Sequence, residues 1–162
     1  MTEQPTSREK QQSLYERVGG YDVIYKMAAA GLRRAMADPV IGHFWNHMSE
    51  SSFKREHINF VDFLVAQWGG NDNYRGKDMI TTHRGMGITE EHWDALMNCI
   101  AQGHAEASLP KALAEEIQAF FRKWKPAVVG SPSYRDVVLA HPDMDVTKGM
   151  ASVGIVWPPR NG

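Results

Sequence analysis

The chain has 162 residues, 43% of them hydrophobic and 23% charged, a composition typical of one soluble globular domain with a short appendage. Its 18 basic and 19 acidic residues leave a net charge of −1. Nucleic acid is therefore not expected as a partner, because phosphate binding needs clustered basic side chains. No stretch approaches the roughly 18 consecutive apolar residues of a membrane span, so a membrane partner is not expected either.

The cysteine content and the first residues bear on the compartment. The single cysteine, Cys99, cannot form an internal disulfide, which favours a reducing compartment. Residues 1–12 are polar, lack the apolar core of a secretion signal, and are expected to form a flexible N-terminal arm. We therefore expect a cytoplasmic protein.

Helical spacing begins directly after this arm. Ser13 can cap a short helix from Leu14 to Val18, which Gly19-Gly20 ends. A longer helix is expected from Asp22 to Ala37, before Asp38-Pro39, because the residue preceding a proline is pushed out of the helical region. Apolar residues recur through it at three- and four-residue steps: Ile24, Met27, Ala28, Gly31, Leu32, Ala35 and Met36.

The next elements are a short apolar segment and a second long helix. Val40 to Trp45 ends on two aromatic residues, and Ser51 or Ser52 can cap a helix over Phe53–Trp68, which Gly69-Gly70 ends. One face of that helix is apolar except for a single histidine. Its members are Phe53, His57, Phe60, Leu64 and Trp68.

Two further helices are expected in the second half. Thr89 can cap a helix that continues to about Ala105, and Pro110 can open a helix that Pro126 ends. Because no run in residues 13–130 alternates with a period of two, we expect an all-α domain over these residues. Residues 131–162 hold four of the eight prolines, and we expect them to form an extension that is docked on the domain or partly disordered.

One histidine, His83, lies between the turn at Gly69-Gly70 and a segment interrupted by glycines. A histidine at the end of a short helix can bind haem iron as an axial ligand. A lone histidine in an amphipathic segment is nevertheless more often a surface or a core residue. The motifs around His83 therefore decide between these interpretations.

Those motifs, in this order, resemble the truncated haemoglobins, most of all the first, cyanobacterial-type group. The resemblance covers about residues 13–130 and implies a shortened globin, a two-over-two sandwich of helices. It further implies a haem b cofactor, and O₂, NO or CO as ligands. The motifs are Leu14-Tyr15-Glu16-Arg17-Val18-Gly19-Gly20, Ala37-Asp38-Pro39, Phe44-Trp45, Gly69-Gly70, Tyr74-x-Gly76-x-x-Met79-x-x-x-His83 and Gly87-Ile88-Thr89.

The resemblance also assigns roles to individual residues. His83 matches the proximal histidine that binds the iron, and Met79, one turn earlier, would lie on the same side of the haem. Trp93 matches an aromatic position that packs beside the haem. The other residues expected to line the haem are Phe44, Trp45, Phe60, Leu64 and Leu32. Without His83, plain core packing would be the favoured explanation of these apolar side chains.

The distal side departs from the family pattern. Leu32 stands where group members commonly have a tyrosine, and leucine cannot donate a hydrogen bond to a ligand. Counting forward from Trp45 places His57 at the distal polar position, where it would donate a hydrogen bond to the ligand or bind the iron as a sixth ligand. Counting back from Gly69 instead places Phe60 there, with Glu56 a turn earlier. We favour His57, because it lies within the apolar stripe.

Several functions fit this pattern. The leading hypothesis is a haem protein for oxygen binding and oxygen transport, or for the binding of NO and CO, as a monomer or weak homo-oligomer. The alternatives are a redox enzyme, either an NO dioxygenase or peroxidase-like and served by an unidentified reductase, and a haem-based sensor or interaction module. Among the remaining histidines, His43, His47 and His92 are expected to face solvent, and His104 to place positive charge near a helix C-terminus.

Overall fold

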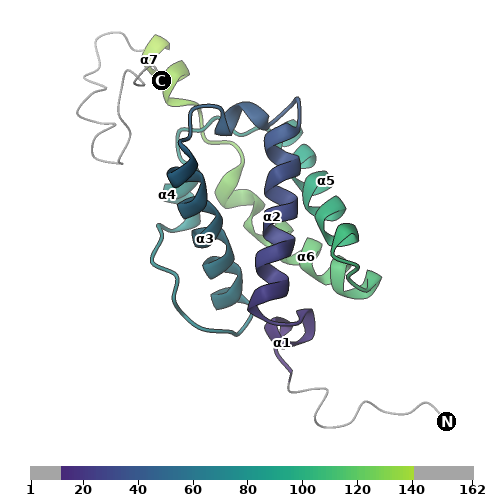
Figure 1. Cartoon of the computed structure of the whole chain (residues 1–162). Helices are drawn as coiled ribbons and strands as arrows, with labels where there is room; N and C mark the ends of the chain where they lie inside the picture. Colours follow the sequence, from purple (N-terminus) through teal and green to yellow (C-terminus); the bar gives the residue numbers. More distant parts are fainter. Residues whose placement is uncertain (1–11, 141–162) are drawn as a thin grey trace, which may run out of the picture. The chain divides into compact units, whose positions relative to one another are not determined.

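The computed structural model describes residues 12–140, and every regular element in that range is a helix, as the sequence predicted (Figure 1). The flexible arm predicted for residues 1–12 lies outside the described residues except for residue 12, and so does the part of the predicted extension from residue 141 onward. None of the described helices is both long enough and apolar enough to cross a membrane. The elements are α1 (Leu14–Val18), α2 (Tyr21–Ala37), the 3₁₀ helix η2 (Gly42–Trp45), α3 (Glu50–Gln67), α4 (Met79–His83), α5 (Glu90–Glu106), α6 (Lys111–Val128) and α7 (Tyr134–Ala140).

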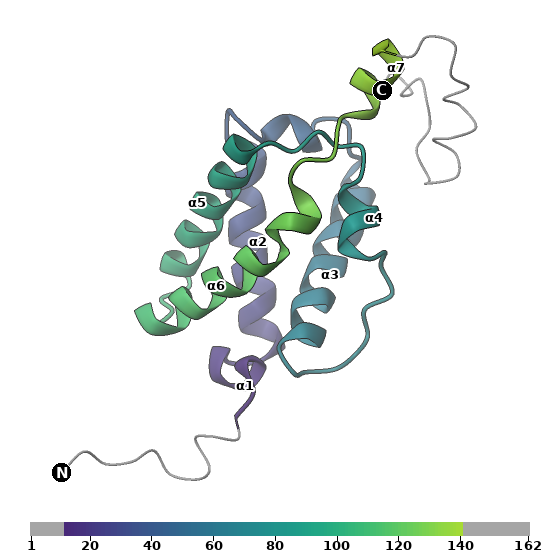
Figure 2. The same cartoon turned by 180° about the vertical axis from the view of Figure 1, so that it is seen from behind.

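The described residues group into two compact units. The first holds the residues up to Gly76 together with Ala95–Ala119, and the second holds Lys77–Asp94 together with the residues from Phe120 onward. Within the second unit, the chain after α6 passes the loop between α4 and α5 on its way to α7 (Figure 2). His83 therefore belongs to the second unit, whereas α2, η2 and α3 belong to the first.

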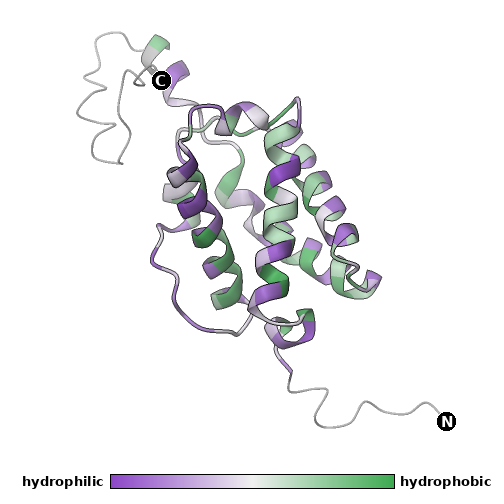
Figure 3. Ribbon diagram, in the orientation of Figure 1, coloured by the Kyte–Doolittle hydropathy of each residue, from purple (hydrophilic) through white to green (hydrophobic). Residues whose placement is uncertain are grey.

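The core of the first unit follows the apolar stripes seen in the sequence. Ile24 and Ala35 on α2 and Val61 on α3 have no exposed surface. The hydrophilic first turns of α3 give way to hydrophobic turns towards its end (Figure 3). The backbones of α2 and α5 come very close at Gly31 and Gly103, where a Cβ on Gly103 would lie 3.0 Å from the Gly31 nitrogen. A methyl group at Gly103 would therefore press on the backbone of α2, whereas one at Gly31 would make only ordinary contacts with Ile100.

Helix α3 begins three residues before the expected Phe53. The hydroxyl of Ser49 accepts a hydrogen bond from the backbone N–H of Ser52 at 3.2 Å, and Ser49 itself has an extended backbone. The prediction of a cap at Ser51 or Ser52 was therefore wrong. Of three neighbouring serines, the first takes the cap, and the apolar stripe alone did not indicate how far the helix extends beyond it.

Helix α6 continues past Pro126, so the prediction that this proline ends the helix was also wrong. Pro126 lies in the last turn, and the N–H of Val129 still donates to the Lys125 carbonyl at 2.9 Å. So near the end of a helix, the missing proline N–H removes a single hydrogen bond, which the remaining turn tolerates. Gly130, with a φ of +95°, follows the helix.

Two of the remaining histidines have structural surroundings that the sequence did not indicate. His92 closes a reciprocal cap on α5: its N–H donates to the Thr89 hydroxyl at 3.2 Å, while its Nδ1 accepts from the Thr89 N–H at 3.0 Å. His104 is only 2% exposed, and burial lowers its pKa to about 4, so the expectation of a positive charge there was wrong. Burial favours the neutral imidazole over a charge that could interact with the helix dipole.

Candidate functional site

Helix α4, which carries His83 as its last residue, is only five residues long and depends on its cap. One carboxylate oxygen of Asp78 accepts from the N–H of Thr81 at 2.9 Å, and the other accepts from the Thr81 hydroxyl at 2.6 Å. These hydrogen bonds hold the pKa of Asp78 below its ordinary value, so the capping carboxylate stays ionised. An isolated helix of this length is not stable, and the cap offsets part of that cost.

The ring of His83 is half-buried and oriented by the backbone of its own helix. Its Nδ1 lies 2.8 Å from the carbonyl oxygen of Met79. Because a carbonyl only accepts, Nδ1 carries the proton, and Nε2 is left with its lone pair. Burial also lowers the pKa of His83, which favours the neutral ring. A neutral imidazole, held by a backbone carbonyl on one nitrogen, is the form in which histidine binds a metal or haem iron.

Met79 thus contributes a backbone atom to the site. The sequence placed its side chain on the same side as His83 but could not indicate the carbonyl contact, since every residue carries a carbonyl. Trp93, the aromatic residue predicted beside the haem, belongs to the same unit as His83 and is 5% exposed. Its role next to a haem stays a prediction.

The apolar residues predicted for the distal side lie in the first unit. Leu32 and Leu64 are 7% and 1% exposed, respectively. Phe44 and Trp45 are half-buried against the cluster formed by Ala35, Ile41 and Cys99. Phe60 is also half-buried. Their apolar surface would suit a porphyrin, and the side chain of Leu32 offers no hydrogen-bond donor.

His57 is buried, but its contacts are with α2. Its Nε2 lies 3.2 Å from the carbonyl oxygen of Tyr25, and the two rings pack with their centres 4.4 Å apart. Since the carbonyl can only accept, Nε2 is the donor in this hydrogen bond. In this conformation the ring nitrogen that would face a ligand or an iron is bound to the backbone of the neighbouring helix.

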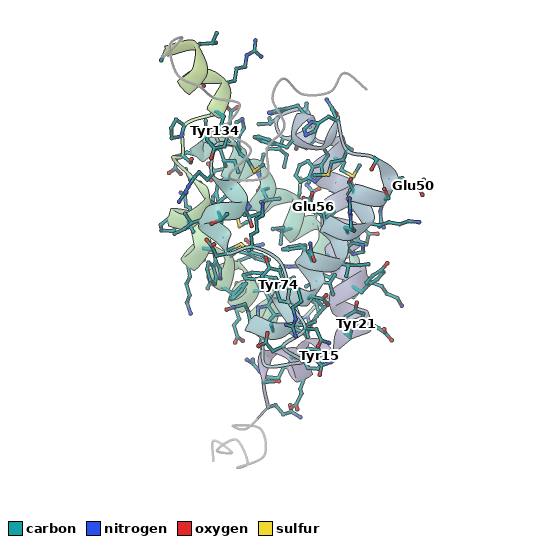
Figure 4. All side chains as sticks on the ribbon, turned by 90° about the vertical axis from the view of Figure 1, so that its left-hand side faces the viewer. Tyr15, Tyr21, Glu50, Glu56, Tyr74 and Tyr134 are labelled. Atoms are coloured by element: carbon teal, nitrogen blue, oxygen red, sulfur yellow. The ribbon has the colours of Figure 1, made fainter. Side chains whose placement is uncertain are left out.

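Glu56, the residue before His57, lies midway along α3, well away from Glu50 at its start (Figure 4). Its Oε1 accepts from the indole N–H of Trp45 at 3.1 Å. Burial raises the pKa of Glu56, while this hydrogen bond and the charge of His47 act in the opposite direction. The structure therefore brings Trp45 together with Glu56, a carboxyl group to which the sequence analysis gave no role.

Known proteins resemble this chain in sequence. The sequence pattern of a family described as bacterial-like globin matches residues 13–129. The chain is 26% identical over 107 residues to a group 1 truncated haemoglobin from Tetrahymena pyriformis, covering 66% of this chain and 86% of that protein. It is also 26% identical over 131 residues to the group 1 truncated haemoglobin GlbN of Synechocystis sp., covering 78% and 97% of the two chains.

Solved structures show the same fold. The ferric truncated haemoglobin from Tetrahymena pyriformis superimposes with a TM-score of 0.68 at 24% identity, over 74% of this chain and all of that chain. The haemoglobin of Chloroflexus aurantiacus gives a TM-score of 0.64 at 22% identity, over 74% and 99%. The all-α fold, the sequence match and these solved structures together define a chain of the globin class. The chain belongs to the bacterial-like globin family, as a haem-binding truncated haemoglobin of the first group.

These findings confirm the predicted fold, the two-over-two helical globin, and the predicted cofactor, haem b. Binding of small ligands is the general function of the family. The match ends at residue 129, just before the segment that joins α6 to α7.

Proposed function

We propose that His83 binds the haem iron through Nε2 as its only protein ligand, leaving the opposite position open to O₂, NO or CO. The observation that carries this proposal is the hydrogen bond from Nδ1 to the Met79 carbonyl, which fixes the tautomer and frees Nε2. The lowered pKa of the ring supports the same role. When bound, the iron supplies the coordination position at which a diatomic ligand binds.

The other predicted residues act on the ring system rather than on the iron. We expect the Met79 carbonyl to orient His83, and the side chains of Met79 and Trp93 to contact the haem on the proximal side. The distal contacts would come from Leu32, Phe44, Trp45, Phe60 and Leu64. With Leu32 apolar, no side chain at that position donates a hydrogen bond to bound O₂, which predicts a faster loss of O₂ than a tyrosine would allow.

His57 is the candidate for a sixth ligand, and its contacts in the structure predict whether it binds the iron. It would have to give up the hydrogen bond to the Tyr25 carbonyl and its packing on the Tyr25 ring before Nε2 could reach an iron. We therefore expect five-coordinate iron in the reduced protein. A single broad visible band on reduction supports this expectation, and sharp, split bands that disappear in His57→Ala would assign the sixth ligand to His57.

The proximal assignment is tested with His83→Gly. The parent protein, the variant and a control, His47→Gly, which removes an exposed histidine, are prepared with haem and compared by optical absorption. We expect the parent and the control to share one Soret spectrum, and His83→Gly to lose it until free imidazole is added. Identical haem retention and spectra in His83→Gly would show that another residue binds the iron.

A second candidate function is redox catalysis, either NO dioxygenation or peroxide chemistry, with a separate reductase as partner. The observation that favours it is Glu56, a half-buried carboxyl group with a raised pKa that can hold a proton nearer neutral pH than a solvated one. Rapid, saturable NO consumption by the oxygenated protein, slowed in Glu56→Gln, supports this function. A rate no faster than that of free haem removes it.

The proposal also covers the cellular compartment and the oligomeric state of the protein. The single cysteine, Cys99, is buried and free, which supports a reducing, cytoplasmic setting. We also expect a monomer or weak homo-oligomer. Light scattering over a range of concentrations distinguishes these from a stable assembly.

A further inference from the structure

The loop that follows His83 is shaped by two glycines. Gly85 and Gly87 have φ angles of +80° and +67°, in the left-handed region that disfavours other residues. This loop is joined to the end of α4 by hydrogen bonds from the N–H of Arg84 to Ile80 at 2.9 Å and from the N–H of Met86 to His83 at 3.2 Å. Its position and that of His83 are therefore coupled.

Residues 130–134, which lie just beyond the family match, bind this loop along its length. The N–H of Gly130 donates to the Ile88 carbonyl at 3.1 Å, and the N–H of Tyr134 donates to the Gly85 carbonyl at 3.0 Å. In the reverse direction, the N–H of Gly85 donates to the Ser131 hydroxyl at 3.0 Å. Three hydrogen bonds thus join two segments that are more than forty residues apart in the sequence, all within the second unit.

The loop after His83 and residues 130–134 are also in close side-chain contact. A Cβ on Gly85 would lie 2.0 Å from the ring carbons of Tyr134, and a Cβ on Gly87 would lie 2.8 Å from the Cβ of Ser133. Distances below 3.0 Å do not occur for real Cβ atoms, so both glycines are needed for the two segments to meet. The loop therefore has a surface that fits residues 130–134 and excludes a larger side chain at either glycine.

We propose that residues 130–134 form a clamp that positions His83, so that this part of the chain sets the strength of the bond between the histidine and the iron. The inference rests on the proposed role of His83. Helix α4 has one turn and cannot hold its last residue by itself. The clamp fixes the loop at Gly85, two residues after His83, and so limits how far the histidine backbone can move away from the iron. The residues after the family match thus gain a function in ligand chemistry.

The clamp is tested in the full chain with Tyr134→Ala, Tyr134→Phe and Arg135→Ala. Phenylalanine keeps the ring that meets Gly85, and Arg135 is exposed on the same helix, which makes Arg135→Ala a matched control. We expect Tyr134→Ala to lose haem about tenfold faster, the size of effect seen when an outer partner of an axial ligand is removed. The iron–histidine stretching band of the reduced protein should move to lower frequency. Tyr134→Phe and Arg135→Ala should match the parent in both measurements.

Gly85→Ala provides an independent variant, because it disrupts the contact from the side of the loop while residue 134 remains a tyrosine. It should shift the same stretching band in the same direction as Tyr134→Ala. If the band and the haem-loss rate of Tyr134→Ala equal those of the parent, the clamp does not position His83. A lower melting temperature with an unchanged band also overturns the inference, since residues 130–134 would then only stabilise the fold.

The failure of the clamp and the failure of the proximal assignment give different results. If His83→Gly keeps the parent spectrum, His83 is not the iron ligand, whatever Tyr134→Ala does. If His83→Gly loses the spectrum while Tyr134→Ala behaves as the parent, the assignment of His83 stands and the clamp alone is rejected.

Discussion

His83 and His57 each place one ring nitrogen on a backbone carbonyl, yet with opposite consequences. In α4, His83 uses Nδ1 and the carbonyl of its own helix, four residues earlier. In α3, His57 uses Nε2 and a carbonyl of the neighbouring helix α2. The first arrangement leaves Nε2, the outer nitrogen, able to bind iron, whereas the second uses that same atom to join two helices.

The comparison shows that burial of a histidine on a helix does not decide its role. His57 is buried and His83 is half-buried. The nitrogen that the backbone engages is what separates a candidate ligand from a residue that holds α3 against α2. The tests below examine this difference, beginning with the largest expected effect.

Replacing the two histidines by alanine should separate ligand binding from stability. His83→Ala should lose most of the haem affinity, measured as haem transfer to an excess of another apo-globin. His57→Ala should keep that affinity and lower the free energy of unfolding in urea by about 2 kcal/mol, through the lost ring packing and hydrogen bond. The opposite pattern, with haem loss in His57→Ala alone, would reverse the assignment of the two rings.

His104 provides a third case, a buried histidine whose ring nitrogens have no hydrogen-bond partner among residues 12–140. Its folded-state pKa of about 4 lies below the unfolded value of 6.5, so the unfolded chain takes up a proton first as pH falls. The folded state should lose stability from about pH 6.5 down to pH 4, by about 3 kcal/mol in total, and no further below that. Urea unfolding of His104→Leu across this range should lack that loss. Equal acid sensitivity in the variant and parent would assign the effect to other groups.

The orientation of the His83 ring should also depend on the cap at the start of α4. Asp78→Ala removes both hydrogen bonds to Thr81, so α4 should fray and haem loss should become severalfold faster, whereas Asp78→Asn should retain the cap. Because the folded pKa of Asp78 is lowered, the cap should persist above the ordinary carboxyl range and weaken only as pH falls below it. Stopped-flow haem transfer measures both effects.

The smallest expected effect concerns the carboxyl group next to His57. Trp45→Phe removes the indole N–H that stabilises ionised Glu56, so the pKa of Glu56 should rise further above its ordinary value. Infrared difference spectra of the carboxyl band against pH measure this shift, with Glu56→Gln identifying the band. An unchanged titration in Trp45→Phe would show that the hydrogen bond does not contribute in solution.

The sequence was sufficient for the long helices and for the family, but not for the atoms that orient the two rings. Helix positions follow from side-chain periodicity, and the order of glycine pairs and aromatic residues around His83 led to the correct family. The carbonyls of Met79 and Tyr25 carry no sequence signal, because every residue has one. The pairing of Trp45 with Glu56 depends on how η2 packs against α3.

The wrong predictions at helix ends and at His104 also concern features that residue type alone does not determine. Ser49, Ser51 and Ser52 are equally good caps by residue type, and in the structure the first of them caps the helix. Pro126 is a strong helix breaker in the middle of a helix but a weak one in its last turn. For His104 the sequence could not reveal that its turn of α5 is buried, so a favourable interaction with the helix dipole was assigned to a ring that stays neutral.

The crossing of α2 and α5 at Gly31 and Gly103 limits how this chain can vary. A methyl group added at Gly103 would meet backbone atoms of Gly31, so there is no side chain that could move aside. The two helices would have to separate slightly, and the cost would spread along both of them instead of remaining local. Gly103 therefore sets how closely α5 approaches α2, whereas Gly31 has room for a methyl group.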